Sequence, residues 1–528
     1  MTADVRVAAI DVGSQSVRAA VFGLDGHCLA RATRPITIHR PAPDHAEQSS
    51  AEIWAAACAS LREAMTIARC APVQIASLAF DATSSVVLGR RDGVPLGIST
   101  TGEPRWDVVM WCDHRAVAEA AEIDATRHRA LDFVGGRMSP EMVLPKLMWV
   151  KRRLPAAWQR ADLALDLTDW MGWRATGRDA ASNCALTCKW AHLAHEEPAW
   201  PADLLARIGL DDLLARTALP ARGLPTAARL GPLSAAAAAE LGLTTDCIVG
   251  VGVIDAQAGC LGSLASLEAT RIDREIAVIG GTSTCHMAIS RTPRPVPGVW
   301  GPYLGTLLPG LWLNEGGQSA TGSLLEHVVA SHSAARQFGP DPHARLWAEI
   351  ESRSAREPDW LPHAIVVPDF NGNRSPLADP QARGLVWGLT LDASPDALVD
   401  LYAAAAIGAV LGTRHVIEAM DRAGWAIERL HLVGGHARSR GFAQLYADAT
   451  GCEVALAEGE DGVLAGTAII AATALAGTPD PADAARRFWR PTAVLAPSPG
   501  RADRLRRHYR AFRDLQAAGL AAGRLITS

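Results

Sequence analysis

The sequence has 528 residues, of which 49% are hydrophobic and 20% are charged, and its formal net charge is −5 at pH 7. A chain of this length exceeds one ordinary hydrophobic core, so it predicts two domains of roughly 250 residues each, and its apolar content argues against extensive disorder. Acidic and basic residues are interspersed without a basic block, which excludes nucleic acid as an expected partner.

Residues 5–36 contain β-forming residues grouped around two turns, at 13–14 and 24–26. The second turn, Leu-Asp-Gly, is a strong hairpin signal because glycine readily adopts positive φ. The segment therefore predicts strand, turn, strand, turn, strand. A helix is expected from Ser49 or Ser50, since serine is a favoured N-cap and an acidic residue follows in the first turn.

The middle of the chain repeats this opening theme. A strand ending in polar residues is predicted over 75–89, and the segment 156–232 predicts helices. A strand leading into a helix of small residues follows over 247–264, and residues 274–290 again predict strand, Gly-rich turn, strand. The repeat indicates a duplicated α/β architecture with a cleft between the halves, although any large α/β protein contains several Gly-rich hairpins.

The last part of the chain predicts mainly helices. Residues 397–424 form a long helix, and 429–451 pass from a strand through a turn into a helix. The apolar segment 463–477 is too short to span a bilayer and fits a buried helix better. Residues 501–516 predict an amphipathic surface helix. With no signal-peptide pattern and scattered cysteines, the sequence predicts a cytoplasmic protein that does not contact a membrane.

Lysine is rare, which excludes two common ATP-binding layouts. The chain contains only Lys146, Lys151 and Lys189. None of them lies in a G-K-[ST] phosphate loop, and none lies in a V-A-I-K strand of the protein-kinase type. If the protein binds ATP, backbone amides, hydroxyls, arginine and metal must hold the phosphates.

The opening turn carries the first candidate site. Asp11 ends a predicted strand, and Gly13, Ser14 and Ser16 give a turn whose N–H groups can point at phosphate oxygens. Asp11 could hold magnesium through water, because Mg²⁺ takes few carboxylates and keeps several waters. Arg18 on the returning strand could reach a phosphate. The alternative is an ordinary hairpin with a solvated aspartate.

Asp255 is the candidate catalytic base. It follows an apolar strand and precedes small residues, which let a ligand or another backbone approach closely. A carboxylate at this place can accept the proton of a hydroxyl group as that oxygen attacks phosphorus. A helix N-cap is the alternative role.

Two further turns fit a nucleotide. Residues 280–283, Gly-Gly-Thr-Ser, make a second turn that suits an anion. Gly434 and Gly435 after a predicted strand permit the flat, close approach that adenine or ribose requires. Each turn alone is a weak signal, since Gly-Gly turns are common.

In their order along the chain, the D-x-G-[ST] hairpin, the G-x-x-D-x-x-A-G segment around Asp255, the Gly-Thr turn and the late strand-Gly-Gly turn resemble the FGGY family of carbohydrate kinases. The resemblance covers essentially the whole chain. It implies an α/β fold of two actin-like (ribonuclease H-like) domains with a cleft between them. The N-terminal FGGY domain, 1–250, would carry the sugar site and the first phosphate turn, and the C-terminal FGGY domain, 251–528, the base and the nucleotide site.

Other segments are similar to the family's motifs. Trp111 and Asp113 stand in a W-x-D-x-R segment, and Lys146 in P-K-L-x-W. Arg374 and Asp379 belong to a G-x-R-x-P block, and a Gly-rich stretch ends in the start of a nucleotide-side helix. The alternatives are that the tryptophan is simply core and that Arg374 and Asp379 form a structural ion pair.

The resemblance implies a role for each matching residue. Asp255 would be the general base, and Asp11 the carboxylate on the magnesium side. The substrate-binding residues would be Asp81, Thr83, Ser84, Trp111, Asp113, Lys146 and Asp255. The residues that bind ATP would be Asp11, Gly13, Ser14, Arg18, Gly281, Thr282, Gly322, Gly434 and Gly435.

The predicted substrate follows from the kinase motifs that the sequence contains and from those that it lacks. It lacks the R-E-T-T and M-H-G strings of glycerol and xylulose kinases, and it looks most like the D-ribulokinase/ribitol kinase branch. The resemblance thus implies phosphorylation of D-ribulose to D-ribulose 5-phosphate with ATP and Mg²⁺. Alternatives are L-ribulose, xylulose, ribitol or erythritol, a hydrolase, or a non-catalytic actin-like binding protein. The expected partner is the small sugar or polyol, and a homodimer stays open.

Overall fold

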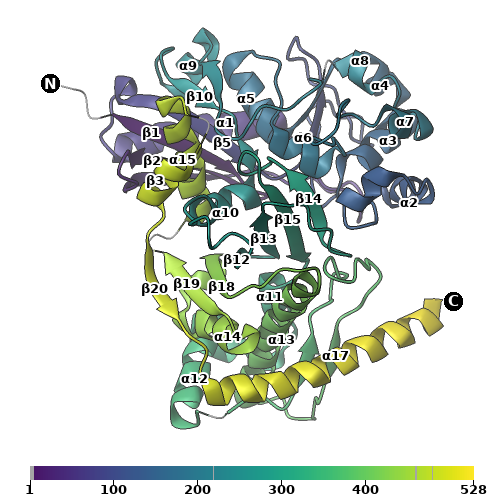
Figure 1. Ribbon diagram of the computed structural model, residues 1–528, viewed down its shortest axis with the longest axis vertical. Helices are drawn as coiled ribbons and strands as arrows, with labels where there is room; N and C mark the ends of the chain where they lie inside the picture. Colours follow the sequence, from purple (N-terminus) through teal and green to yellow (C-terminus); the bar gives the residue numbers. More distant parts are fainter. Residues whose placement is uncertain (1–4, 218, 359, 458–460, 479, 528) are drawn as a thin grey trace.

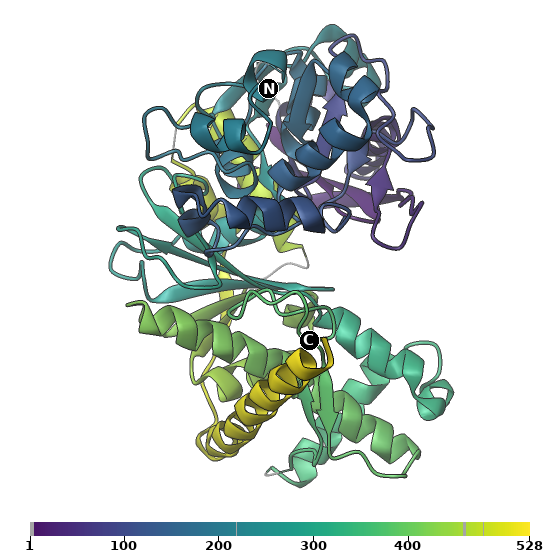
Figure 2. The same ribbon diagram turned by 90° about the vertical axis from the view of Figure 1, so that its right-hand side faces the viewer.

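The computed structural model describes residues 5–217, 219–358, 360–457, 461–478 and 480–527. Within them the chain forms two α/β lobes, each built around a seven-stranded mixed sheet (Figure 1). Buried hydrophobic side chains form two clusters, one centred on each sheet. Figure 2 shows the lobes one above the other, with the long C-terminal helix lying against the second.

The first sheet begins with the two expected hairpins. β1, β2 and β3 are antiparallel neighbours, and β5 pairs with β1 in parallel. The order is β3-β2-β1-β5-β10-β9, and β11 also pairs with β5. The bounds are β1 Arg6–Val12, β2 Ser16–Gly23, β3 Cys28–Pro35, β5 Ile75–Ala82, β9 Arg229–Pro232, β10 Ile248–Gly250 and β11 Val253–Ile254.

The helix predicted from Ser49 or Ser50 is confirmed as α1, Ser50–Ile67, with Ser49 as its N-cap. A smaller sheet, β4-β7-β6-β8, completes the first lobe with short helices around it. Its strands are β4 Glu47–Gln48, β6 Val86–Gly89, β7 Val108–Val109 and β8 Leu163–Asp166. The helices are η1 Pro72–Gln74, α2 Val117–Ala125, η2 Arg129–Phe133, α3 Val143–Arg153, α4 Pro155–Arg160, α5 Leu167–Thr176, α6 Asn183–Lys189, α7 Ala202–Arg207, α8 Leu213–Thr217 and α9 Ala235–Leu241.

The segment 156–232 was expected to be helical throughout, and this is wrong at two places. It contains the strands β8 and β9 besides its helices. Both strands have only four residues, which is too short for a periodic signal. Their pairing with β6 and β10 decides their structure.

The second sheet repeats the strand arrangement at the start of the first sheet, as expected. β12 pairs with β13 in an antiparallel hairpin and with β18 in parallel, as β1 pairs with β2 and β5. The order is β14-β15-β13-β12-β18-β19-β20, and a separate hairpin joins β16 and β17. The bounds are β12 Glu275–Gly280, β13 Thr284–Ser290, β14 Trp300–Leu304, β15 Trp312–Gln318, β16 Ile365–Val367, β17 Leu385–Trp387, β18 Arg429–Gly434, β19 Glu453–Ala457 and β20 Pro491–Leu495.

The helices of the second half pack against both sheets. α15, the apolar segment expected to be buried, packs against β1 and β5 of the first lobe and against α10. α13 is long and apolar enough to cross a membrane, but 72% of its apolar window is buried inside the protein, as in a core helix. The bounds are α10 Asp255–Ala265, α11 Gly322–Ser331, η3 Ser333–Phe338, α12 Pro342–Arg356, α13 Pro395–Arg422, η4 Gly435–Arg438, α14 Arg440–Thr450, α15 Gly462–Ala476, α16 Ala482–Phe488 and α17 Pro499–Thr527.

The division of the chain at residue 250 stays a prediction. β11 and α15 both follow that residue, yet β11 completes the first sheet and α15 covers it. The described chain therefore crosses between the lobes more than once.

Candidate active site

Three carboxylates gather at one edge of the first sheet. In the parallel register, Asp11 of β1 lies opposite Asp81 of β5, and Asp81 lies opposite Val253 of β11. Asp255 follows β11 directly. Because the carboxyl ends of parallel strands meet at the same edge, side chains from three distant segments converge here.

Asp255 is the first residue of α10 and is partly exposed. The N-cap is Ile254, so Asp255 does not have the N-cap role that was its alternative. Its Oδ1 accepts a hydrogen bond from the N–H of Ala256 at 2.7 Å. Burial and the charge of Asp11 raise the pKa of Asp255 to about 7, although Lys189 and Arg18 oppose the shift. A carboxyl group with this pKa can accept a proton near neutral pH.

Asp11 is buried and forms an ion pair with Arg18, its partner across the β1–β2 hairpin. Burial raises its pKa, and Arg18 counteracts this. Arg18 also pairs with Asp461 at 2.7 Å. Arg18, expected to reach a phosphate, is thus held between two carboxylates and is one-third exposed.

Asp81, which was expected to line the sugar pocket, lies beside Asp11, and its contact with a sugar stays a prediction. Its Oδ2 accepts a hydrogen bond from Thr467 of α15, and it is fully buried. Burial, followed by the charge of Asp11, raises the pKa of Asp81 well above its ordinary value. Asp81 therefore belongs to the carboxylate cluster.

The cluster suits a hydrated magnesium ion. Oδ1 of Asp11 and Oδ1 of Asp81 are buried and have no hydrogen-bond donor in the described part of the chain. Among those same residues, no group of three or more His, Cys, Asp or Glu side chains is arranged as a complete metal site. Mg²⁺ does not require one, since it commonly binds one or two carboxylates, waters and substrate phosphates.

The glycine turns of the second lobe form one unit. The N–H of Gly322, at the start of α11, donates to the carbonyl of Gly281 at 3.0 Å, and a Cβ at Gly322 would lie 2.5 Å from that oxygen. Gly434 lies opposite Gly280 in the β12–β18 register. Gly281 and Thr282 are exposed, so the turn is accessible to a ligand.

Gly434→Ala is expected to raise the KM for ATP by about tenfold and to lower the melting temperature. Gly434 has φ +85°, and a Cβ there would lie 2.5 Å from the carbonyl oxygen of Gly280. The turn must therefore move. Gly424→Ala is the matched control, because Gly424 has φ +94° with open space around it. Equal KM values for ATP in the two variants, measured by initial rates, would contradict a nucleotide role for the turn.

The first turn is linked to Trp111. Nε1 of Trp111 donates to Oγ of Ser14 at 3.0 Å, and Gly13 N–H closes the turn onto Ser16. Trp111 is partly exposed, so it is not simply a core residue.

Arg374 lies between two aromatic rings. Its guanidinium carbon is 5.8 Å from the ring centre of Trp111 and 5.4 Å from that of Trp300. It forms an ion pair with Glu141 at 3.1 Å, so the expected alternative of a pair with Asp379 is wrong. Its Nε is buried and has no acceptor within the described residues. The hydrogen-bonding capacity of this donor is therefore unused among these residues.

Lys189 and Glu315 are a second buried pair, 3.3 Å apart. The ammonium group lies 4.2 Å from the ring centre of Trp300. Burial lowers the pKa of Lys189, but Glu315 and other negative groups outweigh this and raise it, so the side chain is charged. Sequence reasoning missed both residues. The rarity of lysine was a usable signal for Lys189, whereas Glu315 had none.

Asp113 and Lys146, which were expected in the sugar pocket, contact the protein itself, and their contact with a sugar stays a prediction. Both carboxylate oxygens of Asp113 accept hydrogen bonds from Arg115, at 2.8 and 2.7 Å. Nζ of Lys146 donates to the carbonyls of Met110, Trp111 and Glu141 at 2.6–3.3 Å. They support the segment that carries Trp111.

Thr83 and Ser84 are buried and bonded to neighbouring side chains. Oγ1 of Thr83 is 3.1 Å from Oγ of Ser85, and Oγ of Ser84 donates to Asp166 at 2.7 Å. Their contact with a sugar stays a prediction.

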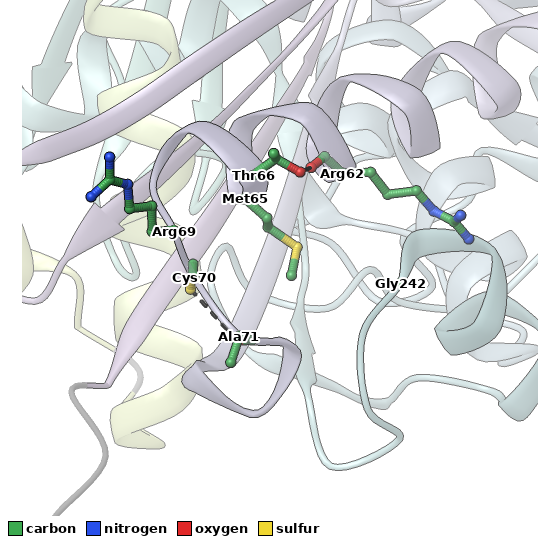
Figure 3. A pocket seen from close by; sticks show the side chains of 7 residues that line it. All are labelled: Arg62, Met65, Thr66, Arg69, Cys70, Ala71 and Gly242. Atoms are coloured by element: carbon green, nitrogen blue, oxygen red, sulfur yellow. Dashed lines mark hydrogen bonds between the residues drawn. The ribbon is translucent and has the colours of Figure 1, made fainter.

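A surface pocket of about 500 Å³ lies elsewhere, at the end of α1 (Figure 3). It is next to the start of β5, whereas Asp81 stands near that strand's other end. The pocket is therefore not part of the candidate site. It is lined by Arg62, Met65, Thr66, Arg69, Cys70, Ala71 and Gly242.

Known proteins resemble the chain over most of its length. Residues 6–262 match the N-terminal domain of the FGGY family of carbohydrate kinases, and residues 276–475 match its C-terminal domain. An FGGY carbohydrate kinase domain-containing protein of Danio rerio is 42% identical, over 95% of this chain and 96% of its own. A D-ribulokinase of Saccharomyces cerevisiae is 32% identical, over 88% and 71%. The crystal structure of a xylulose kinase from Rhodospirillum rubrum, 25% identical, superposes with a TM-score of 0.78 over 98% of this chain and 100% of that one.

Proposed function

The chain belongs to the FGGY family of carbohydrate kinases, and we propose that it transfers the γ-phosphoryl group of ATP to a primary hydroxyl of D-ribulose, giving D-ribulose 5-phosphate. The similarity to the yeast D-ribulokinase supports this sugar among the small ketoses and polyols. The observation that carries the proposal is the partly exposed carboxylate of Asp255, with its pKa near 7, beside two further carboxylates and the charged Lys189.

Asp255 is proposed as the general base. Its carboxylate takes the proton of the terminal hydroxyl as that oxygen forms a bond to the γ-phosphorus. The bond between this phosphorus and the β–γ bridging oxygen breaks, and ADP leaves with the electron pair. The product is a sugar phosphate, and the proton stays on Asp255 until solvent removes it.

The sugar is proposed to bind among Trp111, Arg374, Lys189 and Glu315. Nε of Arg374 donates to a sugar oxygen, and Trp111 covers one face of the sugar. Arg374 and Lys189 are each paired with a glutamate, so the site is suited to a neutral polyhydroxy chain. Asp113 and Lys146 act indirectly by holding the Trp111 segment.

ATP is proposed to bind between the glycine turns. The turns at Gly13-Ser14 and Gly281-Thr282 face the phosphates, and Gly322, Gly434 and Gly435 face the adenosine. Asp11 and Asp81 would hold a magnesium ion, whose positive charge would neutralise the phosphates when it is bound. Three further points remain predictions: the division into domains 1–250 and 251–528, the formation of a homodimer, and a location in the cytoplasm. A measurement of the molecular mass in solution tests the homodimer.

The pH dependence of the reaction tests Asp255 as the general base. Because Asp255 works only when ionised and its pKa is raised to about 7, protonation inactivates the enzyme below that pH. We expect kcat/KM for the sugar to fall about tenfold per unit below pH 7 and to level off above it. Initial rates between pH 5 and 9 measure this, and a profile that stays flat down to pH 5 contradicts the assignment.

A coupled assay of ADP release tests the substrate. D-Ribulose is expected to give the highest kcat/KM among D-ribulose, L-ribulose, D-xylulose, ribitol, erythritol and glycerol, with phosphate on the terminal carbon by NMR. A higher kcat/KM for D-xylulose or another of these compounds would identify that compound as the substrate in place of D-ribulose. It would still support sugar kinase activity. ATP turnover without sugar identifies a hydrolase, and no turnover with any of these compounds favours a binding protein.

A further inference from the structure

Gln516 is a polar residue on the buried face of the C-terminal helix α17. The other buried residues of that face, Leu505, Tyr509 and Phe512, belong to the hydrophobic core of the second lobe. The helix itself lies along this lobe (Figure 2). Gln516 is only 4% exposed. Burying a side-chain amide costs free energy unless it forms hydrogen bonds, so its partner matters.

The amide of Gln516 reaches the loop 369–376. Its Nε2 donates to Oδ2 of Asp369 at 2.9 Å, and Nδ2 of Asn373 donates to the other carboxylate oxygen at 2.8 Å. Asn373 is held in turn by two backbone hydrogen bonds of 2.8 Å with Asp379. Asp369 is thus a buried carboxylate that joins the helix to the loop.

Arg374 is the next residue of this loop. Arg374 and Gln516 line the same small cavity of about 10 Å³, which is close to the smallest space that holds a water molecule. Arg374 also contacts Glu141 and the rings of Trp111 and Trp300. Two hydrogen bonds therefore connect α17 to Asn373, the residue before Arg374 in the chain.

We propose that Gln516 is a positioning residue, which holds the loop 369–376 through Asp369 and Asn373 so that Arg374 meets the sugar. The inference rests on the proposed function, because it requires Arg374 to face the sugar. A displaced guanidinium group would lose its hydrogen bond to the sugar, so such support matters for binding.

Gln516→Met tests the proposal, because methionine has a similar length and lacks the amide donor. The KM for D-ribulose is expected to rise about tenfold. The kcat is expected to stay within about twofold and the KM for ATP to stay unchanged, since neither the base nor the glycine turns move. The matched control is Gln444→Met. Nε2 of Gln444 ties α14 to the carbonyl of Ala496 at 2.9 Å, away from the loop.

A double variant separates positioning from general stability. In an Arg374→Ala background, Gln516→Met is expected to raise the sugar KM no further, while lowering the melting temperature as much as it does alone. The proposal is overturned by an unchanged sugar KM in Gln516→Met, by the same rise in the Arg374→Ala background, or by an equal rise in Gln444→Met.

If Gln516→Met does not fold, Asp369→Asn takes its place with the same expected and overturning results, because it replaces one of the two acceptor oxygens with an amide donor at nearly constant shape and so breaks one link of the chain from Gln516 to Asn373. A wild-type protein that phosphorylates none of the sugars contradicts the proposed function and this inference together. An active wild type with unaffected Gln516→Met kinetics overturns the inference alone.

Discussion

Asp255→Asn is expected to lower kcat by about 10²–10⁴-fold, because asparagine cannot take the proton of the attacking hydroxyl. The affinity for ATP is expected to stay the same, since the hydrogen bond that the Asp255 side chain accepts comes from Ala256 and not from a glycine turn. Rapid-quench measurement of one turnover, with ATP binding followed by fluorescence, gives both quantities.

The melting temperature distinguishes the loss of the general base in Asp255→Asn from misfolding of the variant. Burial and the charge of Asp11 disfavour the ionised form of Asp255, so the neutral asparagine should not lower the melting temperature. Asp246→Asn is the matched control, because Asp246 is exposed and lies nine residues before Asp255 in the chain. A variant at position 255 that retains near wild-type kcat removes the general base from the mechanism.

Lys189→Met is expected to lower kcat/KM for the sugar by about 10²-fold, mainly through KM. The change removes a charged donor, and hydrogen bonds to charged groups contribute about 1.5–3 kcal/mol. It also leaves Glu315 buried without its partner, so the protein is expected to lose stability. Initial rates and thermal unfolding measure the two effects.

The double variant Lys189→Met with Glu315→Gln separates sugar binding from stability. Replacing both charges removes the unpaired carboxylate, so most of the lost melting temperature should return. The sugar KM should stay high, since the donor is still missing. Recovery of the KM together with stability would mean that Lys189 serves the fold and does not bind the sugar.

Local sequence patterns determined the elements that hold single residues of the site. The opening hairpin, the Ser49 cap of α1 and the passage from strand to helix at Asp255 were all predictable, because turn chemistry, capping and hydrophobic periodicity act over a few residues. The same holds for the glycine turns at 280–281 and 434–435. The order of these motifs was enough to indicate the family, which the comparisons confirm.

Only the tertiary structure decided which of these residues meet. Asp81 stands beside Asp11 because β5 pairs with β1, and Lys189 meets Glu315 although 126 residues separate them. Arg374 pairs with Glu141 across 233 residues, where its sequence neighbour Asp379 was the local alternative. Such pairs depend on how the lobes pack, and a long-range contact leaves no periodic or capping signal in the sequence around either partner.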